Sequence, residues 1–173
     1  MRTPKILLVL ILIFFSCKTA KVETKTEKSK AEINLLEFPK QIGFVNDFEK
    51  FFSEEENKFL EDLLVYYEKN SNKKIVIITI GSIPENTRFD KYAIRISNNW
   101  NVGKNNNGNG LTVVLSKSLK KIRISTSEKA KELYLSDELC EKVIYETMIP
   151  QFKNGKHYDG VLLGLNELIR KWM

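Results

Sequence analysis

Residues 74–80 read Lys-Ile-Val-Ile-Ile-Thr-Ile, and this stretch decides the fold class. The run is almost continuously β-branched and ends at Gly81. It predicts a strand buried on both faces, as strands of a parallel sheet under helices are. A second buried strand is expected at 111–116 (Leu-Thr-Val-Val-Leu-Ser). Residues 121–125 (Lys-Ile-Arg-Ile-Ser) alternate, which predicts an edge strand paired with it as a hairpin.

Two helices are expected around the first buried strand. Ser53 and Glu56 form the sequence of a capping box, in which each satisfies a free amide at a helix start. That helix should run to about Asn70, with apolar residues along one face. Thr87 is expected to cap a second helix that extends through Trp100.

Two further helices are expected after the hairpin. They lie at 137–148, where Pro150 is expected to end the helix, and at 159–172. Helices that alternate with strands, together with one hairpin, predict an α/β protein. The expected architecture is a three-layer α/β/α sandwich of Rossmann-like type, with a mixed central sheet of about four strands.

Residues 1–17 have the pattern of a bacterial lipoprotein signal peptide. A basic start precedes an apolar run at 6–15, and a Ser-Cys pair follows. This run is too short to cross a hydrocarbon layer of about 30 Å as a helix, but it suits a secretory signal. We expect Cys17 to become the lipidated first residue of a protein held at a bacterial membrane, outside the cytoplasm in the cell envelope. The alternative is an ordinary cleaved signal in which Cys17 is incidental.

The rest of the chain divides into a spacer and one domain. Residues 18–32 lack aromatics and are rich in Lys, Thr and Glu, so we expect a flexible linker. Residues 33–173 are expected to form the folded domain. The formal net charge of +6 is too small to predict nucleic-acid binding without a basic stripe that carries aromatics. Cys140 falls at an apolar position of a predicted helix, so we expect it in the core.

A series of short motifs lies between about residues 42 and 170. They are Phe44-Val45-Asn46-Asp47, Tyr92-Ala93, Trp100-Asn101-Val102-Gly103, Asn109-Gly110-Leu111 and Lys121-Ile122-Arg123-Ile124, followed by Glu132, Leu135, Asp137, Pro150, Phe152, Gly155, Tyr158 and Gly160. Their order and spacing resemble the TPM domain family, named for thylakoid-lumen, photosystem II repair and membrane-bound settings. The resemblance implies an α/β/α sandwich in a protein that is often exported or membrane-anchored. It also implies divalent-cation binding in some members and acid phosphatase activity in a plant relative.

The resemblance further implies a set of acidic site residues. Asp47, Glu132 and Asp137 match acidic positions of the family. The family usually has Asp just before the Asn-Gly of the long loop, and here that place is Gly108. The inherited site is therefore incomplete at its loop.

A second element of the inherited site is also altered. The family has a Gly-x-Gly turn before the residue that matches Glu132, and the corresponding positions here are Glu128 and Ala130. Both departures weaken the expectation of phosphatase activity. They affect a cation site less.

The loop 101–110 (Asn-Val-Gly-Lys-Asn-Asn-Asn-Gly-Asn-Gly) lies between a predicted helix and a buried strand. We expect it at the carboxyl-end rim of the sheet, where α/β proteins commonly bind ligands. Amide and carboxylate oxygens are the ligands that Ca²⁺ and Mg²⁺ prefer, and Asn109 is the best amide candidate. The alternative is that Asn and Gly serve turns that need positive φ.

Each charged candidate also has a simpler interpretation. For Asp137 the alternative is a favourable interaction with a helix amino end. For Asp47 it is capping or fixing the entry to the first helix, and for Glu132 it is exposure to solvent. His157, the only histidine, lies in a predicted loop without a metal pattern around it, so we expect it to be solvated. Arg123 on the hairpin is expected to be solvated or paired.

Three functions follow from these observations. The first is a lipid-anchored envelope module that binds a divalent cation, Ca²⁺ or Mg²⁺, or a protein partner, without strong catalysis. The second is a metal-assisted phosphatase in which Asp47, Glu132 and Asp137 surround the ion. The third is a structural protein of the cell envelope.

Overall fold

The computed structural model describes residues 38–173. The predicted signal peptide with Cys17, the predicted linker at 18–32 and the first residues of the predicted domain lie outside the described residues. Within the described part, no helix combines the length and the apolar composition needed to cross a membrane.

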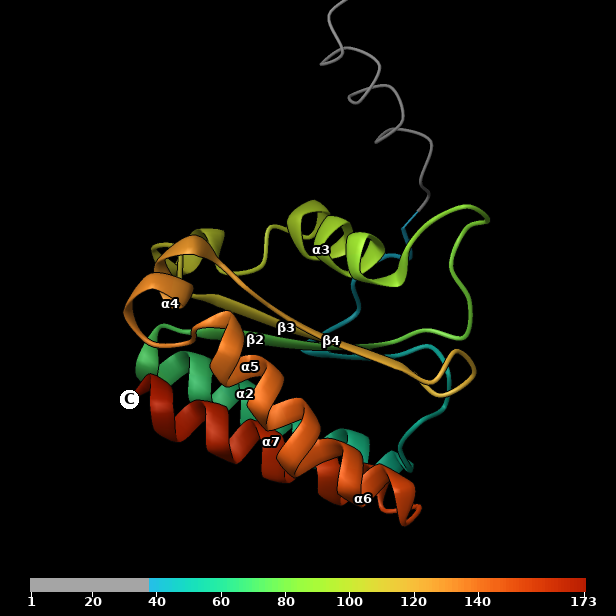
Figure 1. Ribbon diagram of the computed structural model, residues 1–173. Coiled ribbons are helices and arrows are strands. Elements are labelled where there is room, and N and C mark those ends of the chain that lie inside the picture. Colours follow the sequence, from blue (N-terminus) through green and yellow to red (C-terminus); the bar gives the residue numbers. More distant parts are fainter. Residues whose placement is uncertain (1–37) are drawn as a thin grey trace, which may run out of the picture. The chain divides into compact units, whose positions relative to one another are not determined.

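A four-stranded mixed sheet forms the centre of the domain (Figure 1). Its strands are β1 (Val45–Asp47), β2 (Lys74–Thr79), β3 (Gly110–Ser116) and β4 (Lys121–Thr126), side by side in that order. The first three run parallel, and β4 pairs with β3 as the predicted antiparallel hairpin. β1 was not predicted, because it is three residues long and only one of them is apolar.

The strand pairing defines two edges of the sheet. The carboxyl edge is where the parallel strands end, and there Asp47 lies opposite Thr79. The amino edge is where they begin, and there Lys74 lies opposite Gly110. Because β4 is antiparallel, the turn of the β3–β4 hairpin belongs to the carboxyl edge, whereas the chain leaves β4 at the amino edge. These two edges contain the candidate sites.

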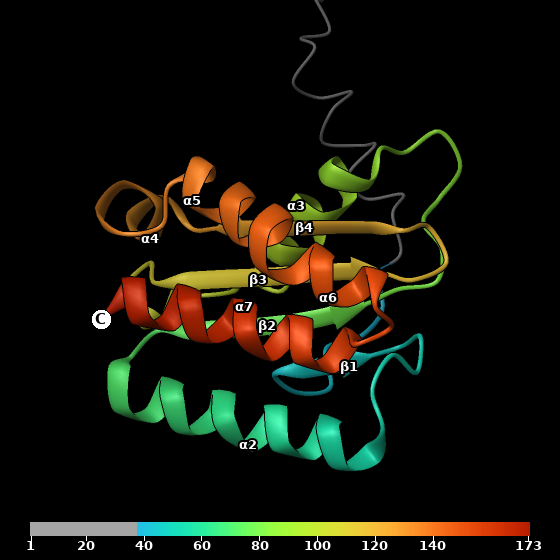
Figure 2. The ribbon, with the colours of Figure 1, turned by 60° about the horizontal axis from the view of Figure 1, so that its bottom comes forward.

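Helices cover both faces of the sheet (Figures 1 and 2). One face carries α2 (Glu54–Ser71), α5 (Asp137–Lys142), the π-helical turn η2 (Val143–Met148), α6 (Ile149–Lys153) and α7 (His157–Trp172). The other carries α3 (Phe89–Asn99). Two short elements, the 3₁₀ turn η1 (Lys104–Asn106) and α4 (Glu128–Leu133), complete the domain. The predicted three-layer α/β/α sandwich with a mixed sheet is confirmed.

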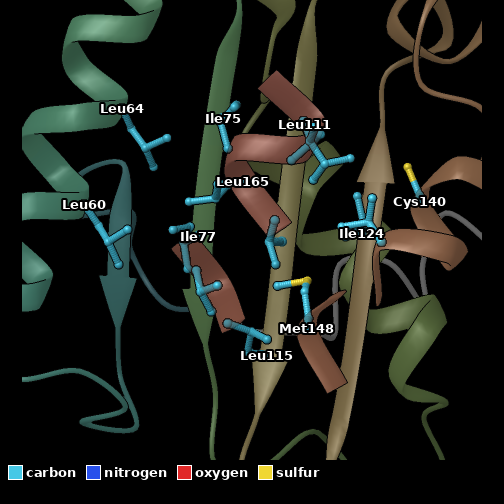
Figure 3. Packing of buried hydrophobic residues seen from close by; sticks show 14 of the residues in the cluster. Leu60, Leu64, Ile75, Ile77, Leu111, Leu115, Ile124, Cys140, Met148 and Leu165 are labelled. Carbon is cyan, nitrogen blue, oxygen red and sulfur yellow. The ribbon is translucent and has the colours of Figure 1, made fainter. Parts of the chain in front are cut away.

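Alternate residues of β2 enter two separate hydrophobic cores. Ile75 and Ile77 belong to the larger core beneath α2 and α7, and Figure 3 shows them beside Leu60, Leu64 and Leu165. Val76 and Ile78 belong to the smaller core beneath α3. Burial on both faces explains why this strand is an unbroken apolar run.

The first helix begins as the sequence predicts. Ser53 Oγ accepts a hydrogen bond from the Glu56 amide at 3.2 Å, and the Glu56 carboxylate accepts one from the Ser53 amide at 2.8 Å. The helix ends at Ser71, and the residue that caps it, Asn72, has a left-handed backbone with φ 54°. The predicted capping box is confirmed.

The start of α3 differs from the prediction. The residue before its first turn is Arg88, which makes no side-chain capping bond, so Thr87 is not the cap. The Thr87 amide instead donates to the Pro84 carbonyl at 3.2 Å, in the turn that precedes the helix.

Pro150 does not end the helix that begins at Asp137. The chain widens into η2 after Lys142 and continues as α6, with Pro150 in the first turn of α6. Pro150 thus lies where the π-helical turn passes into α6 within one continuous helical segment, so the prediction that it ends the helix is wrong. The last helix, α7, begins at His157 and not at Asp159.

Candidate functional site

The long loop at 101–110 lies at the amino edge of the sheet. It leads into β3, whose first residue, Gly110, pairs with the first residue of β2. A segment that enters a parallel strand must end where that strand begins. The expectation that this loop lies at the carboxyl-end rim is therefore wrong.

Glycine and asparagine give this loop its shape. A Cβ on Gly103 would lie 2.4 Å from the Gly110 Cα, and a Cβ on Gly110 would lie 2.4 Å from the Val102 carbonyl oxygen. Asn101 and Asn107 have left-handed backbones with φ 51° and 55°. The turn interpretation thus accounts for these two asparagines.

Asn106 and Asn109 of the loop make side-chain hydrogen bonds. Asn106 is buried, and its amide group donates to the Glu68 carboxylate at 3.0 Å and to the Asn72 side chain at 3.3 Å. Asn109 is half-buried, and its Nδ2 donates to the Asn106 carbonyl at 2.9 Å. That bond orients the Asn109 amide, and its Oδ1 accepts no side-chain or backbone hydrogen bond from residues 38–173. Asn109 therefore retains an oxygen for a ligand.

Ser127 joins the loop to the start of α4. Its Oγ accepts from the Gly110 amide at 2.9 Å and donates to the Gly108 carbonyl, and its own amide donates to the Gly110 carbonyl at 2.8 Å. Directly after it, Glu128 is exposed in the first turn of α4 and Ala130 is buried in the larger core. These two residues favour a helix where glycines would favour a turn.

Glu132 and Asp137 are both exposed near this edge, on α4 and at the start of α5. The Asp137 carboxylate forms an ion pair with Lys131 at 2.6 Å. This hydrogen bond raises the pKa of the Lys131 ammonium. Asp137 also lies in the first turn of α5, where a negative charge is favourable, next to the cap formed by Ser136.

Asp47 lies at the opposite edge. Its carboxylate accepts from the Phe51 and Phe52 amides at 2.8 and 3.0 Å and from the Thr79 hydroxyl. These bonds fix the segment that leads from β1 into α2. Thr79 is five residues along β2 from Lys74, which separates the two edges by roughly 16 Å.

The four candidate ligands therefore do not meet. Asn109, Glu132 and Asp137 come from segments at the amino edge, and Asp47 lies at the carboxyl edge. Across residues 38–173, no three His, Cys, Asp or Glu side chains converge closely enough to hold a metal ion. A cation at the amino edge would need amide or carbonyl oxygens besides the carboxylates.

The carboxyl edge contains a pocket of about 590 Å³ that the sequence did not suggest. Its apolar walls are formed by Phe51, Leu115, Ile122, Ile149 and Phe152. Four lysines also line it, Lys117, Lys120, Lys121 and Lys153. The residues come from three distant segments of the chain, so no local motif reveals the pocket. We call this feature the lysine-rimmed pocket.

His157 lines the same pocket and is half-buried. Its ring centroid lies 5.1 Å from that of Phe51 and 5.6 Å from that of Phe152. It is the first residue of α7 and packs against aromatic rings, so the prediction of a solvated loop histidine is wrong.

A smaller hollow of about 210 Å³ lies at the amino edge. Its lining includes Ser97, Asn101, Gly108 and Ser127. It is thus formed in part by the loop that contains Asn109.

The structure also shows the environment of Cys140 and of Arg123. Cys140 is buried in the larger core, as expected, and burial raises the pKa of its thiol to about 11. Arg123 is half-buried on β4, and its Nε is enclosed without a hydrogen-bond partner among residues 38–173. It forms no ion pair with that part of the chain, and Nε is its one guanidinium nitrogen enclosed there without a partner.

The family model described as TPM domain matches residues 45–171. No curated protein matches the chain. Among solved structures, the N-terminal domain of a protein from P. gingivalis is 24% identical, with a TM-score of 0.66 over 73% of this chain and 80% of that one. The BA42 protein from Bizionia argentinensis is 19% identical, with a TM-score of 0.62 over 72% and 83%.

A third solved structure, the N-terminal domain of a protein from Corynebacterium glutamicum, is 11% identical to this chain. Its TM-score is 0.58, over 80% of this chain and 86% of that one. At these identities, the likeness to all three structures shows a shared fold.

Proposed function

This chain belongs to the TPM domain family, and we propose that it is a lipid-anchored module of the bacterial cell envelope that binds a divalent cation or a protein partner without strong catalysis. The lipid is placed on Cys17, at the end of the signal sequence at 1–17. The predicted linker at 18–32 would join this anchor to the domain. Metabolic labelling with palmitate tests the anchor. We expect label in the protein and none in the Cys17→Ser variant, and label retained by that variant would contradict the assignment.

The proposed cation site lies at the amino edge. Asn109 offers an amide oxygen, and Glu132 and Asp137 offer exposed carboxylates from neighbouring segments. Ca²⁺ and Mg²⁺ both accept such oxygens. Asp47 is not included, because its carboxylate oxygens already hold the Phe51 and Phe52 amides.

One observation supports weak binding without strong catalysis most directly. The Asp137 carboxylate is held by the Lys131 ammonium at 2.6 Å, so a cation must compete with a positive charge already present. At Gly108, the loop also lacks the carboxylate that the family resemblance leads us to expect. A metal-assisted hydrolase needs its ion held firmly enough to polarise a phosphoryl oxygen.

The thermal midpoint of the protein in EDTA and then in millimolar Ca²⁺ or Mg²⁺ tests the cation site. A ligand at 100 times its dissociation constant stabilises a fold by about 2.7 kcal/mol, which is a shift of several degrees for a domain of this size. The shift should disappear in Asp137→Ala and increase in Lys131→Gln.

The control variant is Asp62→Ala, which removes another exposed aspartate paired with a lysine, on α2. It should retain the shift. If neither ion shifts the midpoint, the cation site is wrong and the protein-binding alternative remains. A pull-down from an envelope extract with the anchored protein, and with the Cys17→Ser form as control, would then identify the partner.

The metal-assisted phosphatase remains a second candidate, because Gly108 has room for the missing carboxylate. A Cβ at this position would have the Lys129 Cβ at 3.6 Å as its nearest contact. The backbone φ of +79° is unfavourable, but Asp tolerates it better than most residues. If Gly108→Asp strongly raises phosphomonoester hydrolysis in the presence of Mg²⁺ and Gly108→Asn does not, the protein is a weakened enzyme. If hydrolysis does not rise in Gly108→Asp, the result favours the binding module.

If neither ions nor partners bind, the third candidate applies, a structural protein of the envelope.

A further inference from the structure

The lysine-rimmed pocket at the carboxyl edge takes no part in the proposed function. We propose that it is a second binding site, which takes a single-chain amphiphile with an anionic head. The apolar chain of the ligand would lie between the aromatic and aliphatic walls. Its head would lie among the lysines at the rim. This proposal is independent of the cation site, which lies at the other edge.

The apolar walls are built before any ligand enters. Phe51 and Phe152 approach each other with ring centroids 6.2 Å apart, and His157 contacts both rings. Gly160 on α7 makes this wall possible, because a Cβ there would lie 2.5 Å from the Phe152 ring. A preformed, mainly apolar hollow of about 590 Å³ has the size usual for small-molecule sites.

The charge around the pocket has one sign. Lys117, Lys120, Lys121 and Lys153 line it, and no Asp or Glu does. None of the four pairs with an acidic side chain within the described part of the chain. At the amino edge, by contrast, Lys131 is already neutralised by Asp137. The lysines of the pocket are therefore available to an anion.

One acidic side chain near the rim, Glu49, already accepts hydrogen bonds from the turn of the β3–β4 hairpin. The Glu49 carboxylate accepts from the Lys117 amide at 2.8 Å and from the Ser118 amide at 2.7 Å. It holds the backbone of the β3–β4 turn and is not among the residues that line the pocket. It lowers the positive potential of the rim without occupying it.

The lining also indicates what kind of anion fits. Apart from the lysines, its polar side chains are Ser116 and His157, and the Ser116 hydroxyl already accepts from the Leu119 amide at 3.1 Å. A sugar or a base would need several directed hydrogen bonds. An acyl chain needs none, and lysine ammonium groups suit a carboxylate or phosphate head as mobile point charges.

Isothermal titration of the full-length protein with three ten-carbon probes below their micelle concentrations tests the proposal. We expect decanoate and decyl phosphate to bind and decyltrimethylammonium, whose head has the same sign of charge as the lysines, to bind at least about tenfold more weakly. The double variant Lys120→Gln/Lys121→Gln should lower the affinity for decanoate about tenfold. The matched control Lys69→Gln/Lys91→Gln removes the same charge from α2 and α3 and should leave the affinity unchanged.

Three results would overturn the proposal. They are equal affinity for the cationic probe, equal losses in the two double variants, and no binding of either anionic probe. A second experiment, with phospholipid vesicles, distinguishes binding of a ligand in the pocket from binding of the lysines to a membrane surface. Binding to vesicles rich in anionic phospholipid that needs Lys120 and Lys121, without binding of monomeric decanoate, would assign the lysines to the bilayer surface instead. The titrations and the vesicle binding are carried out in EDTA, so that the outcome does not depend on the cation site.

Discussion

At the carboxyl edge of the sheet, Asp47 and Glu49 hold the backbone, whereas at the amino edge glycine and asparagine shape it and Glu132 and Asp137 face solvent. Asp47 holds two amides before α2, and Glu49 holds two amides of the β3–β4 turn. Glu132 and Asp137 at the other edge are exposed. The comparison teaches that a carboxylate at a family position is not by itself a ligand. A carboxylate is available to a cation only if its oxygens do not already accept the hydrogen bonds that hold the fold.

The largest expected effect on stability comes from a comparison of two glycines with positive φ. Gly103→Ala should lower the free energy of unfolding by about 3 kcal/mol or more, because its Cβ would meet the Gly110 backbone at 2.4 Å. Gly155→Ala is the control, since it has a similar φ of +75° but nothing within 4 Å of its Cβ. It should cost about 1 kcal/mol. Urea denaturation measures both, and equal losses would show that the close approach at the amino edge is wrong.

Removing the Asp47 carboxylate should have the next largest effect. Asp47→Ala leaves the Phe51 and Phe52 amides and the Thr79 hydroxyl without their acceptor, which should cost about 2–3 kcal/mol. Asp137→Ala should lower the urea midpoint much less, because its ion pair with Lys131 and its charge at the start of α5 are both exposed to solvent. If the two variants lose equal stability, the contrast between the edges fails.

A smaller effect is expected at the hairpin turn. Glu49→Gln keeps the shape of the side chain but weakens its bonds to the Lys117 and Ser118 amides, for a loss of about 1 kcal/mol. Hydrogen exchange of these two amides should accelerate, and that of amides in α3 should not. Unchanged exchange at the turn would mean that Glu49 does not hold it.

The thiol of Cys140 gives a probe of the amino edge that leaves stability unchanged. Burial raises its pKa to about 11, so at pH 8 the thiolate fraction falls far below that of an ordinary cysteine. In a Cys17→Ser background, iodoacetamide should react about a hundredfold more slowly with the native protein than with the unfolded one at pH 8. The native rate should rise with pH up to about 11. Similar native and unfolded rates would mean that the segment with Asp137 opens readily.

The sequence predicts most of the sheet because β2, β3 and β4 differ sharply in hydrophobic pattern from their surroundings. It does not predict β1 or α4, since a strand of three residues and a helix of six contain too few periods to recognise. Capping at Ser53 is local and was predicted correctly.

The sites were harder to predict than the elements. The loop at 101–110 was placed at the wrong edge, because a loop that leads into a parallel strand lies where the strand begins. Asp47, Glu132 and Asp137 are candidates by family position and Asn109 by its place in the loop, and only the strand pairing shows that Asp47 is apart from the rest. The lysine-rimmed pocket depends on packing between Phe51, the hairpin and α6, which no single stretch of sequence encodes.

The most direct test of the separation between the edges is an amide NMR titration of the full-length protein with Ca²⁺. Shifts at Asn109, Gly110, Glu132 and Asp137, with the amides of Phe51 and Phe52 unmoved, are the result that we predict. Shifts that include Phe51 and Phe52 at the same Ca²⁺ concentration would mean that Asp47 releases these amides to bind the ion. That result would contradict the division of the acidic residues into a structural edge and an exposed one.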